Sequence, residues 1–217
     1  QRDSATVVPL HTFGTTPTLK LGNIKLHSSF YYQMGSVTDD INISGMMAHL
    51  DLTYTKSKVK PTIGFDYLSG DDKSTTDIEG FNPLHGTHHK FYGFMDYFYV
   101  GNGHNGGGNG ASGGLLDFYL KAAFPIQKSK LVTHLHGFMS PTDVNSVSGE
   151  GLDKYLGTEL DLVWVKKMKE GVMLKVGYSQ MFNTESAAAI KGQDYDNVLG
   201  NQSWAWVMID FTPKFLK

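Results

Sequence analysis

The sequence predicts an all-β chain that folds as an antiparallel transmembrane β-barrel or as a portion of one. Apolar and polar residues alternate with a period of two along segments of about ten residues. Short turns and longer connections follow one another along the chain. Helix signals are scarce, since only residues 186–190 favour a helix and this segment is too short to be stable alone. Ten-residue strands with short turns at one end and long loops at the other are typical of outer-membrane barrels.

Nine segments show this alternation. The clearest is residues 24–34, where Ile24, Leu26 and Phe30 share one face and polar residues occupy the other. Residues 131–139 alternate least clearly, because both faces mix apolar and polar side chains. The nine predicted strands are residues 11–21, 24–34, 46–54, 59–67, 116–124, 131–139, 156–164, 172–182 and 204–211.

The apolar face of these strands is predicted to contact lipid, and aromatic residues near the strand ends are placed as interfacial girdles require. The rows expected in the lipid band include Leu50, Leu52, Leu116, Phe118, Leu120, Leu160 and Leu162.

Composition excludes several other classes. The 217 residues carry a formal net charge of −2, which provides no basic surface for nucleic acid. Cysteine is absent, so there is no disulfide or thiolate site. No apolar run is long enough for a transmembrane helix. No signal peptide is visible at the start, and we expect that a leader was removed or that the chain begins inside a longer protein.

The strand count sets an expectation about partners. The short turns fall on one side only if residues 69–114 form a single inserted connection on the long-loop side. Nine is odd, whereas single-chain bacterial barrels have even strand numbers, and unpaired edges are not tolerated in hydrocarbon. We therefore treat residues 1–217 as one barrel domain or barrel portion. Its partners would be outer-membrane lipid and further strands from an N-terminal half or another chain.

The inserted connection is rich in aromatic residues. Connections this long are usually functional or disordered, and disordered segments have few aromatics. We expect it to enter the barrel and constrict it, with Tyr92, Phe94, Tyr97 and Phe98 packed against the wall.

Two segments resemble a known family. Residues 65–71 (Phe-Asp-Tyr-Leu-Ser-Gly-Asp) and residues 81–98 resemble the alginate export family of outer-membrane proteins, in the form found in Bacteroidota. Residues 30–35 and 206–211 look like the strands that flank this motif in the family. The resemblance covers the chain from about residue 10 onward. It implies a large monomeric barrel with a channel in the bacterial outer membrane, of which this chain is similar to the C-terminal half.

The predicted lumen face mixes lysines with carboxylates, whereas the family's polysaccharide exporters have an arginine-rich pore. The expected function is therefore a porin-like channel for small polar solutes or saccharides. Inward charges in a channel determine which solutes pass. The predicted pore-lining residues are Lys25, His27, His49, Asp51, Lys60, Asp66, Asp96, Asp117, Lys121, Glu159, Asp161 and Lys175.

The histidines and the glycine run of the inserted connection do not predict a metal or cofactor site. His85, His88, His89 and His104 lack the spacing of a metal-binding motif, so no metal is expected there. The glycine run at residues 101–110 lacks the Lys-Ser/Thr pair of a phosphate-binding loop, so it indicates a flexible loop and no cofactor.

Catalysis is also not expected. Asp66, Asp96, His134 and His136 could supply parts of a hydrolytic site, but no motif joins them. Two further functions stay open. One is a structural or interaction subunit of an outer-membrane complex, and the other is a small soluble barrel that binds one ligand.

Overall fold

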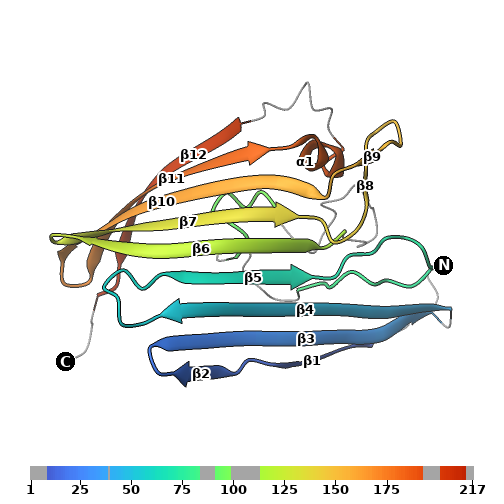
Figure 1. Cartoon of the computed structure of the whole chain (residues 1–217), viewed down its shortest axis with the longest axis horizontal. Helices are drawn as coiled ribbons and strands as arrows, with labels where there is room; N and C mark the ends of the chain where they lie inside the picture. The colour runs from blue at the N-terminus through green and yellow to red at the C-terminus, as the bar shows by residue number, and fades with distance from the viewer. Residues whose placement is uncertain (1–8, 39, 84–90, 99–112, 193–200, 214–217) are drawn as a thin grey trace.

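The computed structural model describes residues 9–38, 40–83, 91–98, 113–192 and 201–213. Within them the chain is all-β, with one antiparallel sheet of ten strands and a small two-stranded hairpin (Figure 1). The strands of the large sheet are β1 (Leu10–Thr15), β2 (Thr18–Leu21), β3 (Ile24–Thr38), β4 (Ile41–Tyr54), β5 (Thr62–Leu68), β6 (Leu115–Ile126), β7 (Ser129–Met139), β10 (Tyr155–Lys169), β11 (Val172–Asn183) and β12 (Asn201–Phe211). The hairpin consists of β8 (Val144–Asn145) and β9 (Gly151–Leu152), and the described residues contain one helix, α1 (Glu185–Ile190).

Each of the nine predicted segments contains a strand of the large sheet. The count is ten because the first segment is divided between β1 and β2, which both pair with β3. Pro17 lies at the break, where it cannot donate a ladder hydrogen bond. Its carbonyl still accepts a hydrogen bond from Ser28 N at 3.1 Å, so β1 and β2 continue one line along β3.

Several predicted strand limits were wrong, including those between β3, which continues to Thr38, and β4, which begins at Ile41. β5 begins at Thr62 rather than at residue 59, because Lys60 takes a left-handed φ of 48° that a strand does not accommodate. β10 continues to Lys169 rather than ending at residue 164, so the turn to β11 is at Glu170 and Gly171, with Gly171 at a φ of 70°. In the described residues no helix is long and apolar enough to cross a membrane.

The polarity of the two faces is the reverse of that in a soluble protein. The exposed face is apolar, and the opposite face carries buried polar side chains. On β6, Phe118 and Leu120 are each 50% exposed. Asp117, which precedes Phe118 and points to the opposite face, is 0% exposed. Cross-strand pairing extends this along rows, since Leu120 lies opposite Ile63 on β5 and Leu135 on β7. The large apolar side chains exposed on this face include Phe13, Leu19, Leu21, Ile24, Phe30, Leu52, Ile63, Phe118, Leu120, Leu135, Val176, Phe182, Val207, Ile209 and Phe211.

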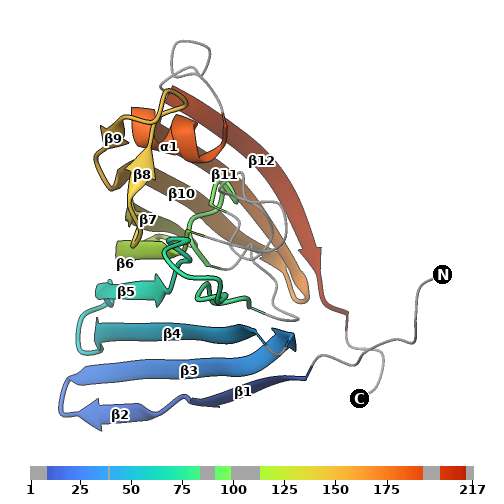
Figure 2. The same cartoon turned by 90° about the vertical axis from the view of Figure 1, so that its right-hand side faces the viewer.

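The sheet is strongly curved, and it is open. Its order runs β1-β3-β4-β5-β6-β7-β10-β11-β12, and β12 is not paired with β1 or β2 in the described part of the chain. Figure 2 shows β12 curling round the side on which the described parts of the connection between β5 and β6 lie. We call this side, which carries the buried polar residues, the concave face. The apolar face is the convex face.

A compact apolar core lies at the end of the sheet where the long connections meet. Leu68, Leu115 and Phe138 from strand ends pack with Phe81 and Phe98 of the connection between β5 and β6. The short helix α1 joins this cluster through Ala187, which is fully buried. Thr184 caps the helix by accepting a hydrogen bond from Ala187 N at 3.3 Å. A six-residue helix is stable here because it is packed and capped, which agrees with its expected inability to stand alone.

Candidate functional site

The concave face carries buried polar side chains at alternate positions of neighbouring strands. Because strand pairing is regular, these residues form rows across the sheet. One row runs from His49 through Asp66 to Asp117, and the next runs from Asp51 past Tyr119 to His136. The buried or partly buried polar residues of this face include Ser29, Gln33, His49, Asp51, Asp66, Asp117, Lys121, His134, His136, Glu159, Asp161 and Ser179.

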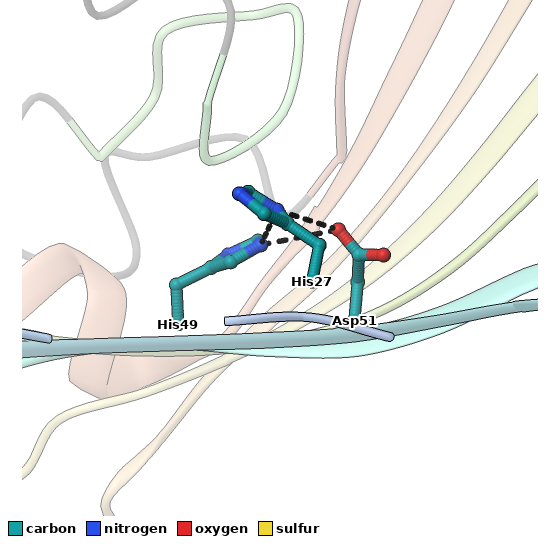
Figure 3. A group of neighbouring side chains, drawn as sticks. All are labelled: His27, His49 and Asp51. Carbon is teal, nitrogen blue, oxygen red and sulfur yellow. Dashed lines mark hydrogen bonds and ion pairs between the residues drawn. The ribbon is translucent and has the colours of Figure 1, made fainter. Parts of the chain in front are cut away.

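The first polar cluster consists of His27, His49 and Asp51, which come from β3 and β4 (Figure 3). Their ring nitrogens and carboxylate oxygen converge on one point. His27 Nδ1 lies 3.1 Å from His49 Nε2 and 3.3 Å from Asp51 Oδ2, and His49 Nε2 lies 3.1 Å from the same oxygen. On its other side, His49 donates from Nδ1 to Oδ1 of Asp66 over 2.6 Å.

The second polar cluster lies further along the same rows and is more deeply buried. His136 Nδ1 donates to Oδ2 of Asp117 over 2.8 Å, and Ser179 Oγ donates to Oδ1 of Asp161 over 2.5 Å. His136 Nε2 faces Asp161 Oδ2 at 3.9 Å, and neither atom has a hydrogen-bond partner among the described residues. His134 completes the group, because its ring contacts that of His136 at 5.9 Å.

Lysines balance part of this negative charge. Lys121 points along the concave face with Nζ 3.8 Å above the centre of the Tyr119 ring. Lys175 forms an ion pair with Asp210 of β12 at 2.9 Å. The concave face therefore presents both signs of charge.

The connection between β5 and β6 is held on the concave face by specific hydrogen bonds. Gln33 of β3 donates to the carbonyl of Asn82 over 2.6 Å and accepts from its N–H over 2.8 Å. Met95 N donates to Oε1 of Glu159 over 2.9 Å. Gly93, at a φ of +85°, lies so close to Glu159 that a Cβ would come within 2.5 Å of its carboxylate.

Aromatic contacts reinforce this attachment. Phe94 packs on His134 with ring centres 4.8 Å apart, and Phe98 packs on Phe138 at 4.7 Å. Tyr92, Tyr97 and Phe98 are buried. The four aromatic side chains predicted to pack this segment against the sheet therefore make contacts there or are buried.

Lys191 also binds the connection between β5 and β6, from the side of α1. It follows α1, and its Nζ donates to the carbonyl of Tyr97 over 2.6 Å while lying 4.1 Å from the centre of that residue's ring. Burial lowers the pKa of Lys191 to about 8. Burial also raises the pKa of Tyr97.

The structure brings together most of the twelve predicted pore-lining residues and separates four of them. Lys25 and Lys60 lie exposed at the end of the sheet with the short turns. Asp96 is exposed on the connection, and Lys175 is paired with Asp210 at the β12 side. The other eight lie along the concave face, and they are His27, His49, Asp51, Asp66, Asp117, Lys121, Glu159 and Asp161.

Some important residues were missed as pore-lining candidates. His134 and His136 were considered only as parts of a hydrolytic site, although both share the inward alternation of Phe138 on β7. No motif marks Gln33 or Lys191, although both bind the backbone of the connection between β5 and β6. The four histidines His85, His88, His89 and His104 and the glycine run lie outside the described residues.

Comparisons with protein-family models and with curated protein sequences find no match for this chain. The resemblance to the alginate export family therefore stays a prediction.

Proposed function

We propose that this chain forms part of the wall of a bacterial outer-membrane channel for small polar solutes or saccharides. The observation that carries the proposal is the reversed polarity of the sheet. Its convex face is apolar and exposed, and its concave face is polar and buried. A wall between lipid and an aqueous lumen needs this arrangement.

The convex face supports contact with lipid. Its apolar side chains continue from β1 to β12, far beyond the few hundred Å² that a soluble monomer usually exposes in one patch. Its middle rows contain aliphatic residues on adjacent strands, such as Ile63, Leu120 and Leu135. A soluble ligand-binding barrel would have the opposite polarity, with an apolar interior.

The unpaired edges of the sheet support the proposal that further strands pair with this chain. β1 and β2 at one edge and β12 at the other each have a single sheet neighbour among the described strands. Unpaired edge amides in hydrocarbon would each cost several kcal/mol. Under the proposal these edges pair with strands of an N-terminal half or of another chain, which completes the barrel around the concave face.

The attached connection supports a narrow pore rather than a wide one. Its described parts lie against the concave face, where Asn82 is fixed to β3 through Gln33 and Met95 is fixed to β10 through Glu159. A segment held there reduces the free cross-section and leaves passage along the polar wall. Mixed charges on that wall favour small polar solutes over a polyanion.

The test is single-channel conductance of the completed barrel in a planar lipid bilayer. We expect stable conductance that increases when residues 81–98 are deleted. A Lys121→Met variant should shift selectivity toward cations, because it removes a positive charge from the wall. Heat-dependent gel mobility would control for folding in both variants. A folded, inserted barrel without conductance would instead support a structural or interaction subunit.

A further inference from the structure

We propose that His27, His49 and Asp51 bind one divalent transition-metal ion on the concave face, with zinc as the first candidate. This assignment does not depend on the channel function. It rests on the positions of three ligand atoms, on the hydrogen bond that orients one of them, and on the open space in front of the site.

The three atoms already have the mutual spacing of metal ligands. They are separated by 3.1, 3.1 and 3.3 Å. A tetrahedral ion bound at about 2.0–2.1 Å places its ligand atoms about 3.3–3.4 Å apart, and an octahedral ion places neighbouring ones about 3.0 Å apart. Small side-chain rotations would therefore admit an ion at the point on which they converge (Figure 3).

The proton positions also favour a cation at this point. An ionised carboxylate only accepts hydrogen bonds, so His49 must donate to Asp66 from Nδ1 and can present a lone pair at Nε2. That nitrogen faces the carboxylate of Asp51 and the ring nitrogen of His27. Lone pairs at this distance repel one another unless a proton or a metal ion lies between them.

Asp66 has the role that a second-sphere carboxylate has in zinc proteins. Metal-binding histidines commonly donate their other ring N–H to a carboxylate, which fixes the tautomer and raises the basicity of the ligand nitrogen. The Asp66 side chain is 3% exposed and lies 2.6 Å from His49 Nδ1. Asp66 therefore orients His49 from behind while the convergence point stays open in front.

Space remains for further ligands. The three residues line a cavity of about 540 Å³ that is also bordered by Tyr31, Tyr119 and Lys121. Three protein ligands with an open position are the pattern of zinc sites that bind water or a substrate. Two imidazoles and one carboxylate suit zinc and other first-row ions and do not suit calcium or magnesium.

The experiment is a Zn²⁺ titration of the full chain in detergent, without a histidine tag, by calorimetry and by competition with a chromophoric chelator. We expect one equivalent to bind. His27→Ala and Asp51→Asn should each weaken binding more than about 100-fold, beyond the range seen for outer-sphere residues. Asp66→Asn should weaken it about 10–100-fold, because it removes only the orienting carboxylate.

Two matched variants control for location. His11→Ala removes an exposed histidine of β1 and should leave the affinity unchanged. His136→Gln alters the second cluster, the other group of histidines and carboxylates whose ligand atoms lie close together among the described residues. It should also leave the affinity unchanged. Circular dichroism would establish that each variant retains its strands.

Co²⁺ in place of Zn²⁺ supplies an independent readout. Its visible absorption should show imidazole coordination in the wild type and lose that signature in folded His27→Ala. The proposal is overturned if Zn²⁺ does not bind saturably, or if Asp51→Asn leaves binding intact. It is also overturned if His136→Gln abolishes binding while His27→Ala does not, which would assign the ion to the second cluster.

Discussion

The two faces of the same strands differ in which side chains they bury: the convex face exposes apolar side chains, and the concave face buries polar ones. On β6, Leu120 is half exposed on the convex face, while the neighbouring Tyr119 and Lys121 point to the concave side. In a soluble sheet the buried face is apolar and the wet face is polar. Here the buried face holds carboxylates and histidines, and its stability depends on pairing among them. The comparison predicts that an added charge is damaging on the convex face, and that loss of a buried charge is damaging on the concave face.

The largest effect is expected on the concave face, from Asp117→Ala. Asp117 and His136 are 0% and 1% exposed in their side chains and are hydrogen-bonded to each other. Removing one partner of a buried pair costs about 3–5 kcal/mol, because the other is left without compensation. Chemical unfolding in lipid vesicles would measure the loss. Phe118→Ala, the next residue on the opposite face, is the matched control, and an equal loss there would contradict the comparison.

The next effect distinguishes a lipid-facing surface from a wet one. Leu120 lies in the middle of β6 on the convex face. Leu120→Arg should lower the free energy of unfolding in lipid vesicles by about 2–4 kcal/mol. The same change on a water-exposed surface would alter it by no more than about 0.5 kcal/mol.

Lys121→Arg is the control, because it keeps the charge on the concave face of the same strand and should change stability little. If Leu120→Arg proved as mild as Lys121→Arg, the convex face would not contact lipid.

Much of this comparison could be predicted from the alternation alone. A period of two assigned Leu120 and Asp117 to opposite faces, since a strand turns successive side chains to opposite sides. The limits of strands were less predictable. Lys60 was expected in a strand, but its left-handed conformation, which no sequence signal indicates for a lysine, ends the alternation before β5.

The clusters on the concave face were less predictable still. Whether His49 meets Asp66 or His136 meets Asp117 depends on the register between strands, and neither pair is close in sequence. Alternation shows that such side chains point inward, and register determines which of them touch. His134 and His136 were further obscured because β7 carries apolar residues on both faces.

A smaller effect is expected where the connection is attached to the concave face. Gln33 is 1% exposed and makes both of its hydrogen bonds with the backbone of Asn82. Gln33→Ala should cost about 1–3 kcal/mol, because it leaves a partly buried backbone donor and acceptor of Asn82 unsatisfied. Hydrogen exchange of the Asn82 amide should increase before the strands open. Gln180→Ala, a side chain that bonds to backbone carbonyls near β12, is the control and should leave that amide protected.

The smallest effect is a pH dependence at Lys191, which attaches the same connection from the opposite side. Burial disfavours the charged amine and lowers its pKa from the ordinary value of 10.5 to about 8 in the folded protein. Between these values the unfolded chain binds more protons than the folded protein, so stability should rise with pH. One proton limits the slope to about 1.4 kcal/mol per pH unit.

The measurement is the free energy of unfolding of wild type minus that of Lys191→Met, which keeps the length of the side chain and removes the amine. The difference should be flat below pH 7 and should increase in favour of wild type from about pH 8 toward pH 10. The measurement ends at pH 10 because exposed tyrosines begin to ionise near that pH. A difference that decreased over this window would mean that contact of the ammonium group with the Tyr97 and Phe98 rings, at 4.1 and 5.6 Å, outweighs its burial. In that case Lys191 would hold the connection as a cation, and the attachment would weaken as the pH rises.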